Sequence, residues 1–401
     1  MVLKMIYDAK FFDEVFERRG HDATKWDYPL FVKDNKDIVP MWVADMDFRT
    51  PDCIVDAMAK RLEHHAFGYF KIPQAYFDGI AKWQKERYGV DGVTADQVDY
   101  QNGVLGGVSS FVEAYSLPGD WILLNDTCYT GFQSTIANRG RNIVYSPVKE
   151  TADGWALDIE DMEKKIIEKK PPIMIFCNPH NPVGRVWTED EVRNIVELCK
   201  KYSVWLFSDE IHGDVVLYGH QYTSAARFAD VYDHMLVYTA ISKTFNMAGL
   251  HSSCTIIPNP EYKKIQEDTL RQAWLMSPNC MANSAIEACY TYGDEWVDEQ
   301  NAYLTENAEF VTSYLKEHAP QIKPVKPEGT YLMWLDCSEL SMTSEEIVKI
   351  LASEYKMAVG GGAGYQGNGE YFLRFNIGCP RETLEKGMEI LAQFVADKKG
   401  V

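Results

Sequence analysis

The sequence lacks any long hydrophobic run. None of its apolar stretches approaches the ~18 residues that a membrane-spanning helix requires, and charges interrupt positions 1–20 too early for the apolar core of a signal peptide. The nine cysteines lie scattered between Cys53 and Cys379, without a CxxC pair and without clustering near histidines. We therefore expect reduced thiols in a cytoplasmic protein, no membrane segment and no bound metal.

Basic residues are scarce relative to acidic ones. The 40 Lys and Arg residues face 59 Asp and Glu residues, which gives a formal net charge of −19. This charge opposes binding to nucleic acids and anionic membranes through bulk electrostatics, although local basic patches stay possible. The content of 46% hydrophobic and 25% charged residues is that of a folded globular protein and argues against a disordered chain.

The chain also lacks internal repeats, low-complexity tracts and a long flexible linker. Its 401 residues are many for one hydrophobic core, so we expect two domains joined by short connections. Short apolar runs alternate with amphipathic stretches through the middle of the chain, which predicts an α/β domain with a mostly parallel sheet between helices. The clearest strands are expected at 121–125, 173–177, 204–207 and 235–239, and the clearest helices at 158–169 and 188–202.

The pattern changes after about Pro278. A helical spacing of apolar residues extends over 283–317, and strands are expected at 329–335 and 371–376, which predicts a smaller α+β domain. We assign residues 46–280 to the large domain and residues 1–45 and 281–401 to the small one. The first 45 residues show no alternating pattern and taken alone fit either domain.

Polar residues follow three successive predicted strands. Asn181, Asp209 and Lys243 each come shortly after an apolar run, and ligands in open α/β sheets bind at the carboxyl ends of the strands. Each residue taken alone has an ordinary alternative: Asn181 between two prolines fits a turn, Asp209 can cap a helix, and a lysine is usually solvated. Their combination predicts a site that presents an amide, a carboxylate and an amine.

A glycine-rich segment, GVLGGVS at 103–109, precedes these residues and opens a helical stretch. Backbone N–H groups at a helix start can bind a phosphate. The spacing matches neither GxGxxG nor a Walker loop, so a tight turn is the alternative.

Five segments together resemble a known family. They are PMWVADMDF at 40–48, NPHNPVGR at 178–185, SDEIH at 208–212, SKTFNMAGL at 242–250 and LRFNIGCP at 373–380. The sequence is similar to fold-type I pyridoxal-phosphate (PLP) enzymes of the class I/II aminotransferase group, and most of all to the cystathionine β-lyase, or carbon–sulfur lyase, branch. The resemblance runs in order from about Trp26 to Pro380, and it implies PLP as cofactor and a homodimer.

The resemblance also implies roles for single residues. Lys243 would bind the cofactor covalently and then, once displaced, act as general base. Asp209 would keep the ring nitrogen of PLP protonated. Asn181 would bind the ring oxygen, and Arg374 would hold the substrate carboxylate with its two-pronged guanidinium group.

Five further residues complete the implied site. Tyr129 would stack on the ring of the cofactor, with a core position as the alternative. The phosphate would lie on the backbone around Val104 and Leu105, with help from Ser242. Tyr69 would reach the phosphate of the neighbouring subunit.

Two positions depart from the family pattern. Many members carry arginine eight residues after the lysine, where this chain has His251. Aminotransferases place a tyrosine three residues after the aspartate, where this chain has His212. We include His212 among the cofactor-binding residues, with a buried structural histidine as the alternative.

The DEIH and SKTFNxAGL forms favour the lyase branch. The predicted reaction is β-elimination from cystathionine or a related sulfur amino acid, which releases a thiol, pyruvate and ammonia. An aminotransferase is the first alternative, because it shares the early steps and differs in needing a keto-acid acceptor. A PLP-binding regulatory protein with little turnover is the second.

Overall fold

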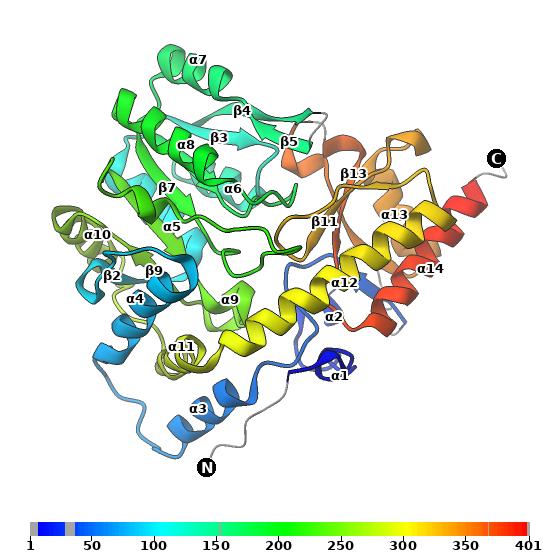
Figure 1. Ribbon diagram of the computed structural model, residues 1–401, viewed down its shortest axis with the longest axis horizontal. Helices are drawn as coiled ribbons and strands as arrows, with labels where there is room; N and C mark the ends of the chain where they lie inside the picture. Colours follow the sequence, from blue (N-terminus) through cyan, green and yellow to red (C-terminus); the bar gives the residue numbers. More distant parts are fainter. Residues whose placement is uncertain (1–6, 29–36, 152–153, 368, 399–401) are drawn as a thin grey trace.

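The computed structural model describes residues 7–28, 37–151, 154–367 and 369–398, which form two sheets flanked by helices (Figure 1). The larger sheet has eight strands in the order β2-β9-β8-β7-β6-β3-β4-β5. Its five central strands, from β8 to β4, are parallel. The strands are β2 Val98–Gln101, β3 Trp121–Asp126, β4 Asn142–Thr151, β5 Gly154–Leu157, β6 Ile173–Cys177, β7 Trp205–Asp209, β8 Met235–Thr239 and β9 Ser253–Ile256.

The parallel strands are buried on both faces because successive side chains point to opposite sides. On β6, Ile173 and Ile175 belong to a core cluster that contains Phe111 of α5. Met174, between them, belongs to the other cluster, together with Ile195 of α8. Helices therefore cover both faces of the sheet, and the predicted α/β class is confirmed.

The helices connect these strands and surround the second sheet. They are α1 Ala9–Phe12, α2 Thr24–Asp27, α3 Asp52–Leu62, α4 Gln74–Tyr88, α5 Gly103–Tyr115, α6 Thr130–Asn138, α7 Ile159–Lys169, α8 Glu189–Tyr202, α9 Ile241–Thr244, α10 Pro260–Gln272, α11 Cys280–Tyr292, α12 Asp294–His318, α13 Ser344–Glu354 and α14 Arg381–Lys398. Thr188 caps α8 as its sequence predicts: the Thr188 hydroxyl accepts from the Glu191 N–H at 3.3 Å. No helix of the described ranges is long and apolar enough to span a membrane.

The smaller sheet has five strands in the order β1-β12-β13-β11-β10. They are β1 Val39–Met41, β10 Lys323–Pro324, β11 Leu332–Asp336, β12 Met357–Gly361 and β13 Phe372–Asn376. The N-terminal strand β1 pairs in parallel with β12, so this early segment joins the C-terminal sheet. In Figure 1 the long helix α12 runs alongside this sheet, next to α14.

The helix expected over 283–317 is interrupted. The structure contains two helices there, α11 and α12, which meet at Gly293. A Cβ atom at this position would lie 2.4 Å from the Phe245 ring and 2.4 Å from the Cys289 carbonyl oxygen. Only glycine allows this close approach, and the apolar spacing of the sequence continues across it without a signal.

Candidate active site

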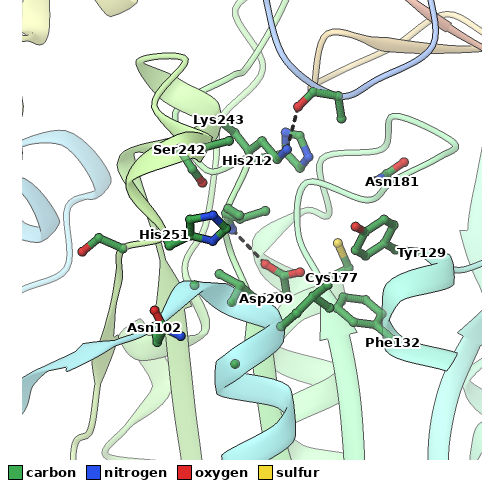
Figure 2. Close-up of a pocket in the computed structure, with 18 residues that line it drawn as sticks. Asn102, Tyr129, Phe132, Cys177, Asn181, Asp209, His212, Ser242, Lys243 and His251 are labelled. Carbon is green, nitrogen blue, oxygen red and sulfur yellow. Dashed lines mark hydrogen bonds between the residues drawn. The ribbon is translucent and has the colours of Figure 1, made fainter. Parts of the chain in front are cut away.

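A cavity of about 520 Å³ opens at the carboxyl ends of the central strands (Figure 2). Its volume falls in the range of about 300–1,000 Å³ that ligand sites usually have. Asp209 ends β7, Lys243 lies in α9 directly after β8, and Asn181 follows β6. The first turn of α5 closes another side, because α5 begins directly after β2.

The structure brings most of the predicted site residues together. Eight of them line the cavity: Val104, Leu105, Tyr129, Asn181, Asp209, His212, Ser242 and Lys243. Arg374 does not line it but donates from a terminal nitrogen to the Asn181 side-chain oxygen at 3.4 Å. Tyr69 lies apart, fully exposed on the connection between α3 and α4. The individual roles of these residues stay predictions.

The Lys243 amine is held inside the cavity by one hydrogen bond. Its Nζ donates to the Ala44 carbonyl at 2.6 Å (dashed in Figure 2). The pKa of Lys243 is lowered to about 8, chiefly by burial and in addition by the nearby Arg374 cation, whereas Asp45 and Asp209 oppose the decrease. A larger share of the amine is therefore neutral near neutral pH than in a solvated lysine, and only the neutral amine is a nucleophile or a base.

The Asp209 carboxyl group is buried beside this amine. Its Oδ1 accepts from the Ile211 N–H at 3.1 Å. Burial raises the pKa of Asp209 to about 7 and Glu210 adds to the rise, whereas Lys243 opposes it. A carboxyl group and an amine whose pKa values are shifted toward each other within one cavity are typical of a catalytic site.

Arg374 reaches the site from β13 in the smaller sheet. One terminal nitrogen donates to the Trp42 carbonyl at 3.2 Å, and the Tyr365 ring lies 5.3 Å from the guanidinium carbon. The side chain is buried, yet its Nε has no hydrogen-bond partner among the described residues. A buried cation with a free donor can bind a carboxylate.

His212 lines the cavity as an uncharged ring. Burial lowers the pKa of His212 well below its ordinary value, and the Lys243 and Arg374 cations lower it further. Its Nδ1 has no partner within the described part of the chain. The imidazole therefore offers a hydrogen bond to a ligand rather than a positive charge.

The start of α5 forms the other end of the cavity. Gly103 has a φ of +70°, a conformation that suits glycine, and it is the first residue of α5, whose first N–H groups are free to bind an anion. A Cβ atom at Gly107 would lie 2.6 Å from the Tyr238 ring, so α5 packs directly on the sheet. Ser242 and His251 line the cavity together with Gly103.

The sequence analysis assigned no individual role to the remaining lining residues. They are Ala44, Asn102, Gly106, Phe132, Cys177, Ile211, Ala248 and Ser252. Asn102 and Ser252 are direct neighbours of Gly103 and His251, which is the one signal that points to them. The Ser252 hydroxyl is buried and has no partner among the residues that the structure describes. Within those residues no group of three or more His, Cys, Asp or Glu side chains is placed to hold a metal ion.

The chain belongs to the aminotransferase class I and II family, whose model matches residues 36–391. It is similar to the Bacillus subtilis (strain 168) protein named cystathionine beta-lyase PatB, with 36% identity over 94% of this chain and 97% of that protein. A PLP-bound putative aminotransferase from Clostridium difficile 630 has a TM-score of 0.91 and 34% identity, over 96% of this chain and 99% of that one.

A second solved structure, a PLP-bound C–S lyase from Staphylococcus hominis, has a TM-score of 0.88 and 29% identity, over 96% of this chain and 97% of that one. These similarities confirm the family resemblance and the fold class that the sequence predicted. They also confirm the predicted enzyme class and cofactor, because the Bacillus subtilis and Staphylococcus hominis proteins are lyases by name and both solved structures are PLP-bound.

Proposed function

We propose that this protein is a PLP-dependent carbon–sulfur β-lyase that cleaves cystathionine or a related sulfur amino acid to a thiol, pyruvate and ammonia. The observation that carries the proposal is one cavity that is lined by two reactive groups and has a third group hydrogen-bonded to its lining. These are the Lys243 amine with a pKa of about 8, the buried Asp209 carboxyl group with a pKa of about 7, and the Arg374 guanidinium group beside Asn181. The similarity to named lyases supports the same reaction.

The residues present fit PLP. Unpartnered buried polar atoms line or border the cavity, namely His212 Nδ1, Ser252 Oγ and Arg374 Nε. Lys243 would hold the aldehyde carbon, Asp209 would face the ring nitrogen, and the start of α5 would hold the phosphate. When bound, PLP supplies an electron sink that stabilises negative charge on the substrate Cα.

The protein groups then divide the remaining work. Arg374 binds the substrate carboxylate, and Asn181 fixes the direction of the guanidinium group through its side-chain oxygen. Lys243 Nζ takes the proton from the substrate Cα. The Asp209 carboxylate would stabilise the positive charge of the protonated ring nitrogen of PLP. The thiolate leaves from the substrate Cβ.

The decisive test is product release from L-cystathionine with PLP supplied and no keto acid added. We expect steady formation of pyruvate and of a free thiol in equal amounts. Conversion of amino acids that depends on an added keto acid would instead establish an aminotransferase. A PLP-bound protein that is silent in both assays would mean a different substrate or a non-catalytic role.

The aminotransferase stays the second candidate, because the Clostridium difficile relative carries that name. Both reactions require the same amine, carboxyl group and arginine. They differ in where the proton goes after it leaves the substrate Cα, which depends on the orientation of the leaving group.

We expect the rate of covalent PLP binding to depend on the protonation state of the Lys243 amine. With a pKa of about 8, the rate at which PLP-free protein binds PLP covalently should rise about tenfold per pH unit below pH 8 and level off above it. Arg374→Met should move the midpoint to higher pH because a neighbouring cation is removed, whereas Arg139→Met at the exposed end of α6 should not. Absorbance stopped-flow measures the rates. A wild-type midpoint near the ordinary lysine value of 10.5 would contradict the assignment.

We also propose that the active unit is a homodimer in which Tyr69 reaches the phosphate site of the partner subunit. Tyr69 is fully exposed, and Phe67 and Phe70 beside it expose large aromatic surfaces. Exposed apolar clusters of this kind favour a protein interface. The substrate is a small amino acid.

Two further predictions belong to this proposal. We keep residues 46–280 as the large PLP-binding domain and residues 1–45 and 281–401 as the small domain. The strands of the eight-stranded sheet fall between Val98 and Ile256, and β1 pairs with β12, which supports that division.

We also propose that the protein is located in the cytoplasm, which its nine free cysteines support.

A further inference from the structure

Residues 42–46, which follow β1, present five successive carbonyl groups to side chains. We call this segment the carbonyl strip. Its carbonyl acceptors and their donors are Trp42 with Arg374 at 3.2 Å, Val43 with Asn376 at 2.6 Å, Ala44 with Lys243 at 2.6 Å and Tyr331 at 3.0 Å, Asp45 with Asn376 at 2.7 Å and Lys25 at 3.1 Å, and Met46 with Asn246 at 2.7 Å and Arg18 at 2.9 Å. Most backbone carbonyls bond to other backbone groups, so five side-chain partners in a row are unusual.

Lys243 and Arg374, the two residues proposed to act on the substrate, both donate hydrogen bonds to the carbonyl strip. Lys243 reaches it from α9 beside the eight-stranded sheet, and Arg374 reaches it from β13 of the five-stranded sheet. The two donors bind carbonyls only two residues apart. The separation of the amine from the guanidinium group therefore depends on where the strip lies.

Asn376 holds the strip on both sides of Ala44. It stands two residues after Arg374 on β13, so both side chains project from the same face of the strand. Its Nδ2 donates to the Val43 and Asp45 carbonyls, and its Oδ1 accepts from the Gly378 N–H at 2.7 Å. The side chain is completely buried.

The end of the strip is anchored by a buried ion cluster. Asp47 accepts from Arg18 at 2.6 Å, from Lys25 at 2.8 Å and from the Trp26 ring nitrogen at 2.8 Å. Lys25 is completely buried and Asp47 nearly so. Asn246 lies three residues after Lys243, and its Oδ1 accepts a hydrogen bond from the Met46 N–H at 2.9 Å. This bond connects the strip to the segment that carries the lysine.

We propose that Asn376 is a positioning residue, which sets the Lys243 amine and the Arg374 guanidinium group at the spacing that one substrate requires by holding the carbonyl strip around Ala44. This inference rests on the proposed function, because Lys243 and Arg374 must act on the same molecule. Without the two Asn376 bonds, the Ala44 carbonyl loses its fixed place. Lys243 then loses its acceptor, and Arg374 loses its register relative to the amine.

The test replaces Asn376 with leucine, which has a similar size and no donor. We expect kcat/KM for β-elimination to fall about 10- to 100-fold, because small misplacements of reacting groups have effects of this size. We also expect the pH midpoint of covalent PLP binding to fall by about one unit, because a hydrogen bond that stabilises the charged amine is lost. The second readout does not depend on turnover.

Asn307→Leu is the matched control. Asn307 on α12 is also completely buried, donates to two carbonyls two residues apart, Ile377 and Cys379, both at 3.0 Å, and accepts from Arg381. It has no bond to the carbonyl strip. This variant should lower the melting temperature while kcat/KM stays within twofold of wild type and the midpoint stays in place.

Equal losses of kcat/KM in the two variants, or an unchanged midpoint in Asn376→Leu, would overturn the proposal. If Asn376→Leu does not fold, Asn376→Ser replaces it, because its smaller side chain leaves room for water while losing the same two bonds. It should change both readouts in the same directions, and wild-type values would overturn the proposal. A wild-type protein that releases no thiol would refute the proposed function alone, since the midpoint still tests Asn376.

Discussion

Lys243→Ala abolishes multiple-turnover β-elimination, with a loss of at least about 10⁴-fold expected, since the variant lacks both the covalent attachment point and the general base. Steady-state pyruvate release at saturating PLP measures the effect. Lys82→Ala, at an exposed lysine of α4 that forms an ion pair with Glu86 at 3.5 Å, serves as the control and should retain full activity. Wild-type-like turnover in Lys243→Ala would refute the enzyme assignment.

The same variant tests the proposed dimer. Lys243→Ala and Tyr69→Ala subunits should each be impaired alone, whereas a mixture that exchanges subunits contains one intact site in each mixed dimer. Random exchange at equal amounts should restore about a quarter of the wild-type activity, because half of the dimers are mixed and each has one native site. An unrestored mixture, with exchange verified, would remove Tyr69 from the partner site and leave the role of Lys243 untouched.

Asp209→Asn has the second large effect, and it acts in opposite directions on activity and stability. We expect kcat to fall about 10³-fold, because a preorganised charge opposite the reacting system is lost. Steady-state assays at saturating PLP measure this loss. The amide oxygen can still accept from the Ile211 N–H, so the local backbone is preserved.

The stability effect follows from the direction of the pKa shift. The folded-state pKa of Asp209 is about 7, above the ordinary value of 3.8, so the folded protein binds more protons between these values. Stability is therefore lost as the pH rises through this window, by at most about 4 kcal/mol. PLP-free Asp209→Asn should melt at a higher temperature than wild type at pH 8, with the gain absent at pH 4.

Asp214→Asn provides the contrasting control in the melting experiment. Asp214 is also buried, but its carboxylate accepts from Trp83, Tyr88 and Thr244 and pairs with Arg87 at 3.2 Å. Removing this charge should lower the melting temperature at pH 8, because Arg87 loses its counter-charge and the three donors are left with one acceptor oxygen instead of two. An equal decrease in the melting temperature of Asp209→Asn at pH 8 would contradict the prediction that burial of the Asp209 carboxylate is unfavourable.

Much of the fold follows from the sequence because strands buried on both faces appear as continuous apolar runs. The four clearest predicted strands correspond to β3, β6, β7 and β8, and polar residues that end or follow β6, β7 and β8 line the cavity. The helix break at Gly293 was missed, since its cause is the distant Phe245 ring. Periodicity reports which face of a helix is buried and carries no information on such a contact.

The contribution of Ala44 could not be predicted for a different reason. It acts through a backbone carbonyl, which every residue possesses, so no side-chain pattern identifies it. Asn376 likewise looks like an ordinary strand residue until β13 and the carbonyl strip are placed side by side. Tyr69 was named through the family resemblance alone, and the single chain leaves it far from the cavity lining.

The ion cluster around Asp47 has a consequence for engineering the N-terminal region. Arg18 and Lys25 line no part of the cavity and precede residue 36, where the family match begins. Through Asp47 they nevertheless anchor the segment that carries the Ala44 carbonyl. Residues 18–27 are therefore not dispensable in an engineered version of the protein. Removing or randomising them would disturb the position of the Lys243 amine, although they do not line the cavity.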